Sequence, residues 1–167
     1  MKPSVKFGLI NGGIGVLFNL ILYITGLNRG SNSFQMIGLI IPIVCMVLAI
    51  KSYKEEIGNG WINFGKAFNL AFIVGLIGGA IGSVYHFLFI KFIDPSFIQF
   101  QLQQQQEKLA DKGYDDVFIE SALKRTEPFL APPVQFGIAM VISVLFAAVI
   151  ALIIAGIMKK PNPEEIG

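Results

Sequence analysis

The stretch VQFGIAMVISVLFAAVIALIIAGIM, residues 134–158, decides the fold class of this chain. It contains no aspartate, glutamate, lysine or arginine. About twenty apolar residues in a helix are enough to cross the hydrocarbon core of a bilayer, which is about 30 Å thick. The stretch is therefore predicted to be a transmembrane helix.

Three other segments share this length and apolarity, at residues 7–27, 34–50 and 67–92. The second of them is the shortest and contains Pro42. Extending it to Tyr53, with lysine side chains reaching back to the interface, would make it long enough to span. The sequence therefore predicts four membrane-spanning helices.

The composition agrees with a membrane protein. Hydrophobic residues make up 54% of the chain and charged residues only 14%, against about 45–50% and about 25% in ordinary soluble domains. The net charge of +2 is too small to indicate a nucleic-acid partner. The single cysteine, Cys45, lies in an apolar run, where a thiol behaves as a small hydrophobic side chain.

Small residues gather on one side of each segment at helical spacing. In lipid no hydrophobic force acts between helices, so close approach through small residues holds a bundle together. The predicted architecture is all-α, an integral membrane four-helix bundle forming a single domain over residues 1–167. The residues expected to form its packing face are Gly12 and Gly15 on the first span, Gly75 and Gly79 on the third, and Ser143 and Ala147 on the fourth.

Asn11, Asn19 and His86 are among the polar side chains within the predicted spans. Polar groups are costly in a membrane and often mark a functional site. They are candidates to line a narrow polar path. The alternative is that these faces serve packing alone, with His86 as a hydrogen-bonded residue near the outer interface.

Residues 94–128 interrupt the apolar pattern with glutamines, acids and lysines. Asp94 and Pro95 are typical of a helix start, and Gly113 of a helix end. A second helix is expected to open at Asp115, and its apolar residues share one arc at about 100° per residue: Phe118, Ile119, Ala122 and Leu123. The segment is predicted to be an extramembrane amphipathic helical hairpin between the third and fourth spans. It could cap the bundle, lie on the lipid surface or bind a partner.

Lysine and arginine collect in the cytoplasmic loops of membrane proteins. The first outer loop would carry Arg29 alone, if the N-terminus is inside. The expected location is the bacterial inner membrane, with both termini cytoplasmic and the hairpin outside. The cytoplasmic side would then hold Lys2, Lys6, Lys51, Lys54, Lys66, Lys159 and Lys160.

Four short stretches carry a family resemblance: FGKAF at 64–68, FIDPSF at 92–97, KGYDDVFIE at 112–120 and IMKK at 157–160. In this order and spacing the chain resembles the small four-helix membrane family known as domain of unknown function 4199, typical of Bacteroidota. Asp94 departs from the asparagine expected in many relatives. The resemblance implies an integral membrane protein of the cell envelope, and it transfers no catalytic residue.

An enzyme would need a nucleophile with a base, paired carboxylates or a set of metal ligands. His86 is the single histidine, and the spans carry no carboxylate in their interiors. We therefore expect no catalytic activity, no cofactor and no metal.

The expected function is a structural or interaction role in the cell envelope. Its partners would be the lipid bilayer and an envelope protein that meets the hairpin, and self-association is also open. The alternative is a small-solute or lipid-handling transporter or pore that uses the polar faces of the first and third spans. Coupled transport would call for an ionisable residue in mid-membrane, which the spans lack.

Overall fold

The computed structural model describes residues 1–29 and 36–162. Within those residues the fold is all-α, and the one β feature is an isolated antiparallel bridge between Ile62 and Lys160. The chain divides into two compact units. Unit 1 comprises Met1–Gly82 and Met140–Gly167, and unit 2 comprises Ser83–Ala139.

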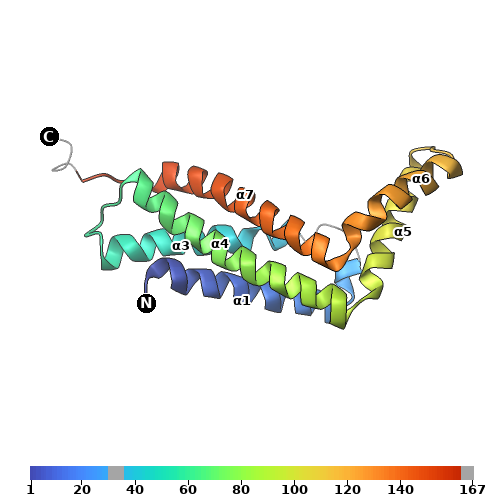
Figure 1. Cartoon of the computed structure of the whole chain (residues 1–167). Helices are drawn as coiled ribbons and strands as arrows, with labels where there is room; N and C mark the ends of the chain where they lie inside the picture. Colours follow the sequence, from blue (N-terminus) through green and yellow to red (C-terminus); the bar gives the residue numbers. More distant parts are fainter. Residues whose placement is uncertain (30–35, 163–167) are drawn as a thin grey trace. The chain divides into compact units, whose positions relative to one another are not determined.

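Unit 1 is built from four helical segments that lie side by side (Figure 1). They are α1 (Pro3–Ile24), α3 (Ile40–Glu56), the first part of α4 (Phe64–Leu88) and the last part of α7 (Pro132–Met158). Successive segments run in opposite directions, so α1 and α4 are parallel, and α3 and α7 return (Figure 1). The start of α1, the end of α7 and the connection from α3 to α4 therefore meet at one end of the unit.

The helix boundaries have local causes. Pro3 occupies the first helical position of α1, where its missing amide hydrogen costs nothing. Pro42 likewise falls in the first turn of α3, so it does not break that helix. The side chain of Asn63 accepts a hydrogen bond from the amide of Lys66 at 2.9 Å and so caps the start of α4. After α1 the chain turns at Gly26, whose φ of +73° suits glycine.

The core of unit 1 lies between α3, α4 and α7. Met46, Ile50 and Val74 are its largest fully buried side chains. Around them lie smaller buried residues, among them Ala49, Ala67, Ala71, Ala147, Ala151 and Ala155. Alanines at these positions let the helix backbones come close, as expected for helices that pack in lipid.

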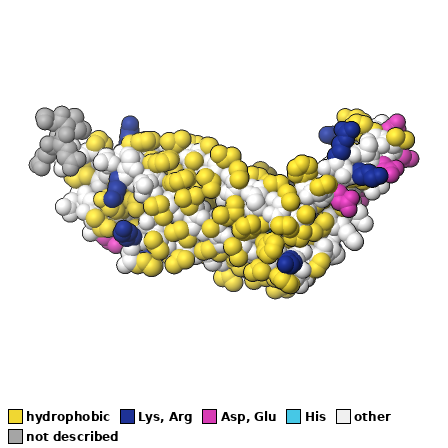
Figure 2. Space-filling model, in the orientation of Figure 1, with side chains coloured by type: hydrophobic (Ala, Val, Ile, Leu, Met, Phe, Trp, Pro, Cys, Tyr) yellow, Lys and Arg dark blue, Asp and Glu magenta, His cyan; other side chains and the backbone are white. Residues whose placement is uncertain are grey.

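The outward sides of these helices are apolar as well. Leu17, Ile21, Val141 and Leu145 are each exposed by more than half, and Figure 2 shows hydrophobic side chains covering the visible face of the long helices. Exposed apolar surface on this scale marks contact with a membrane or a partner. Within residues 1–29 and 36–162, three helices are long and apolar enough to cross a membrane: Pro3–Ile24, Phe64–Ile93 and Pro132–Met158.

The second expected span, residues 34–50, begins outside the described residues. Its described helix, α3, has 17 residues and continues past Tyr53 to Glu56. The expected span 7–27 corresponds to α1, and the expected span 134–158 corresponds to α7. The expected span 67–92 corresponds to α4 together with the π-helical turn Phe89–Ile93 that follows it. Each of these helices begins a few residues before the expected start.

Unit 2 contains the helical hairpin that was expected over residues 94–128. It is formed by α5 (Ser96–Asp111) and α6 (Asp116–Thr126). Gly113 makes the turn with a φ of +80°. The carboxylate of Asp115 accepts a hydrogen bond from the amide of Phe118 at 2.8 Å, so Asp115 caps α6. The helix α5 starts one residue after Pro95, and the carboxylate of Asp94 accepts a hydrogen bond from the Ser96 hydroxyl at 2.6 Å.

Candidate functional site

The contact between α1 and α4 is made by glycines on both helices. A Cβ added at Gly12 would lie 2.5 Å from the Ile81 side chain, and one at Gly8 would lie 2.7 Å from Ile77. On the other side of the contact, a Cβ at Gly78 would collide with the side-chain amide of Asn11. A larger residue at these positions would force the Ile77, Ile81 or Asn11 side chain to shift, so glycine suits the close packing of the two helices.

The contact between α4 and α7 uses four of the residues expected to form the packing face. A Cβ at Gly75 would lie 2.5 Å from that of Ala147, and one at Gly79 would lie 2.6 Å from the Ser143 Cβ. The hydroxyl of Ser143 donates to the carbonyl of Met140 at 2.8 Å, so it is satisfied within its own helix.

Gly15 differs from the other expected packing residues, because a Cβ there would meet nothing within 4 Å. The α1–α4 contact advances four residues at a time, from Gly8 with Ile77 to Gly12 with Ile81. The next step along α4 passes Gly82, where unit 1 ends. Within unit 1, therefore, Gly8 and Gly12 contact α4, whereas Gly15 continues the glycine spacing of α1 without such a contact.

The candidate polar path rests on Asn11, Asn19 and His86. Asn11 is only 7% exposed and fills the space above Gly78. Asn19 is exposed, and its amide donates to the carbonyl of Gly15 at 3.0 Å. His86 belongs to unit 2, where it bonds to Gln135. Asn11 thus lies in a helix contact and Asn19 on an outward side of α1, while the path itself stays a prediction.

A hydrogen-bonded network in unit 2 joins α4, α5 and α7 through glutamine side chains. The Gln135 amide nitrogen donates to the carbonyl of Leu130 at 2.9 Å and to the Gln101 side-chain oxygen at 3.1 Å. Both of its hydrogens are then used. Gln135 Oε1, which lies 2.9 Å from His86 Nε2, can only accept. The network therefore places a proton on His86 Nε2.

A second bond extends this pattern along α5. Gln105 donates to the Thr126 hydroxyl at 3.1 Å, and that hydroxyl donates to the Ala122 carbonyl at 3.0 Å. Gln101 and Gln105 are four residues apart and so share one face of α5. The sequence shows them as breaks in an apolar stripe, although they tie α5 to α7 and to α6.

Gln135 was not among the candidate residues. Its signal in the sequence is that it is the one amide side chain in the stretch 134–158. A polar residue in such a stretch needs a partner. The glutamines of α5 at helical spacing, together with His86, are the groups of suitable chemistry.

Replacing Gln135 with methionine should lower the free energy of unfolding by about 1–3 kcal/mol, because His86 and Gln101 would each lose a partner in a half-buried place. Thermal unfolding in detergent measures this, and hydrogen exchange should rise in α5. The matched control is Gln106→Met, an exposed glutamine on the same helix as Gln101. Equal effects of the two changes would show that the network does not stabilise unit 2.

A metal site would require several histidine, cysteine, aspartate or glutamate side chains close together. Within the described residues, no three side chains of the types histidine, cysteine, aspartate and glutamate lie together. Cys45 is a free thiol buried in the core of unit 1.

The sequence matches a protein-family model over residues 6–160, a range that covers unit 2 and all of unit 1 except its two ends. The chain belongs to the family described as Protein of unknown function (DUF4199). The family expected from the four short stretches is thereby confirmed. No curated protein and no solved structure matches the chain.

In this DUF4199 chain, the tip of the hairpin exposes apolar side chains among polar ones. Val117 is 77% exposed, and Tyr114 and Phe118 are each 46% exposed. The rings of Tyr114 and Phe118 stack with centroids 4.5 Å apart. Ile119, by contrast, is 5% exposed and belongs to the hairpin interior. We call Tyr114, Val117 and Phe118 the hairpin tip.

Proposed function

We propose that this protein is a multi-pass protein of the bacterial cell membrane with a structural or interaction role and no catalytic activity. Its hairpin is the part that contacts another envelope protein. Both termini lie in the cytoplasm and the hairpin lies outside. The observation that carries this proposal is the hairpin tip, an exposed aromatic and aliphatic surface on an otherwise polar pair of helices.

Several features support a role in binding for the hairpin tip. The interior of the hairpin is already filled by Ile119, so Val117 is not needed there. The stacked pair of Tyr114 and Phe118 presents a rigid aromatic surface. Aromatic side chains that lose little freedom on binding are typical of the residues that dominate protein interfaces.

The surroundings of the hairpin tip favour a protein over a membrane as its partner. Asp111, Asp115 and Asp116 lie beside it in sequence and are exposed, with Lys112 as the nearest cation. Helices that bind anionic lipid present lysine and arginine around their apolar side chains. An acidic border instead suits a protein surface that carries positive charge.

One experiment tests both the location and the contact. Cys45 is changed to alanine, and Val117→Cys is labelled in spheroplasts with a membrane-impermeant maleimide that carries a photocrosslinker. We expect labelling, followed on illumination by a discrete adduct with another protein. The matched control is Gln106→Cys, exposed on α5, which should be labelled equally but give no such adduct. A second control, Glu55→Cys at the other side of the membrane, should not be labelled.

Each outcome has a defined meaning. Labelling of Glu55→Cys without labelling of Val117→Cys would reverse the orientation. Adducts of Val117→Cys with lipid alone would place the hairpin tip on the membrane and refute the interaction role. Identical adduct patterns for Val117→Cys and Gln106→Cys would also refute it, because the hairpin tip would then not be selective.

A further inference from the structure

The end of unit 1 where α1 begins and α7 ends is held by a short backbone bridge. The amide of Ile62 donates to the Lys160 carbonyl, and the amide of Lys160 donates to the Ile62 carbonyl, both at 2.8 Å. The Ile62 side chain is 3% exposed and belongs to the core. The connection from α3 to α4 is therefore fixed to the end of α7.

Two lysines at this end of unit 1 lie over aromatic rings. The Nζ of Lys160 lies 4.4 Å from the ring centroid of Trp61, and that of Lys66 lies 5.4 Å from the ring centroid of Tyr53. Such distances are typical of cation–π pairs, which hold an ammonium group in place while leaving it accessible. We call these four residues the lysine–aromatic site.

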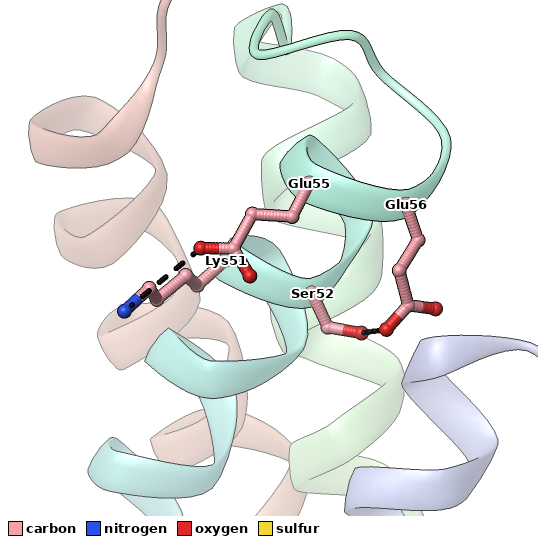
Figure 3. Close-up of polar contacts among 4 residues, drawn as sticks. All are labelled: Lys51, Ser52, Glu55 and Glu56. Carbon is pink, nitrogen blue, oxygen red and sulfur yellow. Dashed lines mark hydrogen bonds and ion pairs between the residues drawn. The ribbon is translucent and has the colours of Figure 1, made fainter.

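Two acidic side chains at the same end, Glu55 and Glu56, are engaged elsewhere (Figure 3). Glu55 pairs with Lys51 at 3.9 Å, and Glu56 accepts a hydrogen bond from the Ser52 hydroxyl at 2.8 Å. Within residues 1–29 and 36–162, no carboxylate pairs with Lys66 or Lys160. Further exposed or half-buried lysines add to the positive charge of this end: Lys2, Lys6, Lys54 and Lys159.

The apolar parts of the helices of unit 1 end close to the lysine–aromatic site. Phe64 is exposed at the start of α4, and Trp61 and Tyr53 are half-buried. Tryptophan and tyrosine favour the membrane interface, where the ring meets the glycerol region and the polar edge meets water. Lysine ammonium groups at that depth lie among the phosphates of the lipid headgroups.

We propose that the lysine–aromatic site binds the headgroup phosphate of anionic phospholipids. Lys66 and Lys160 supply the charge, and the rings of Tyr53 and Trp61 fix the two ammonium groups before the lipid arrives. The inference rests on the proposed membrane location of the protein, and it is independent of any partner of the hairpin.

The single tryptophan of the chain, Trp61, provides a direct probe. The full-length protein is reconstituted in phosphatidylcholine vesicles that contain brominated phosphatidylglycerol or, for comparison, brominated phosphatidylcholine. We expect stronger quenching of Trp61 fluorescence by the brominated phosphatidylglycerol. Each lysine should contribute about fivefold to this preference, since a lysine near an anionic surface is worth about 1 kcal/mol. High salt should weaken the preference.

The variant Lys66→Gln/Lys160→Gln should lose most of the preference. The matched control, Lys108→Gln/Lys112→Gln, removes two lysines from unit 2 and should keep it. Equal quenching of the unaltered protein by the two lipids would overturn the proposal. So would a preference that survives Lys66→Gln/Lys160→Gln, because the charge of the whole end would then be responsible. Neither result bears on the labelling of the hairpin.

Discussion

Replacing Gly75 with leucine should have the largest effect on stability of any single change in unit 1. A Cβ at this position would lie 2.5 Å from the Ala147 Cβ, 2.7 Å from Met46 Cε and 3.2 Å from the Ala147 Cα. The Ala147 contact includes backbone, which cannot turn away as a flexible side chain can. Overpacking of this kind costs about 3 kcal/mol, the upper part of the usual range. We expect a large drop in the midpoint of thermal unfolding in detergent.

The matched control is Gly13→Leu. Gly13 is exposed on α1, and a Cβ there would meet nothing within 4 Å. Leucine favours a helix over glycine by up to about 1 kcal/mol, so this variant should be unchanged or slightly more stable. If Gly75→Leu unfolds at the same temperature as Gly13→Leu, the contact between α3, α4 and α7 is not as close as described.

The contacts at Gly75 and Gly79 were predictable from the sequence, because packing in lipid depends on small residues at helical spacing. That rule identifies a face but not how far a neighbouring helix follows it. Gly15 lies on the same face as Gly8 and Gly12, yet a Cβ there would meet nothing within 4 Å. Which residues of such a face meet a neighbouring helix depends on the geometry of the fold, which helical spacing does not encode.

The glutamines show a second limit. Gln101 and Gln105 look like interruptions of an apolar stripe, since hydrophobic periodicity scores a polar residue only as a loss. Their hydrogen bonds to Gln135 and Thr126 join residues 34 and 21 positions apart. Partners at such separations are set by the fold, so the network could not be derived from local pattern.

The apolar arc of α6 was predictable in its direction but not in its depth. Phe118, Ile119, Ala122 and Leu123 share one side of a helix, and Ala122 and Leu123 are half-buried. Ile119 is 5% exposed, whereas Phe118 is 46% exposed and stacks on Tyr114 instead. A helix that packs against a single neighbour buries only the centre of its apolar arc. Residues at the edge of the arc remain available for other contacts.

This difference leads to a second large effect. Ile119→Asp should open the hairpin, because it removes an apolar side chain worth about 1.5–3 kcal/mol of burial and puts a carboxylate in its place. Two short helices with one shared interior have little stability to spare. Limited proteolysis near Gly113 should become fast, and the amides of α6 should exchange their hydrogens rapidly. If the Ile119→Asp variant is cleaved at the same rate as the unaltered protein, Ile119 does not hold the hairpin together.

The matched variant is Val117→Asp, two residues earlier on the same helix. Val117 is 77% exposed and lies in the first turn of α6, where an acidic side chain is favoured by the helix dipole. Its effect on proteolysis should therefore be within about 0.5 kcal/mol of none. When the photocrosslinker is moved to Tyr114→Cys, however, Val117→Asp should remove the protein adduct. A folded hairpin that no longer forms the adduct would separate partner binding from folding, whereas an adduct that persists would exclude Val117 from the contact surface.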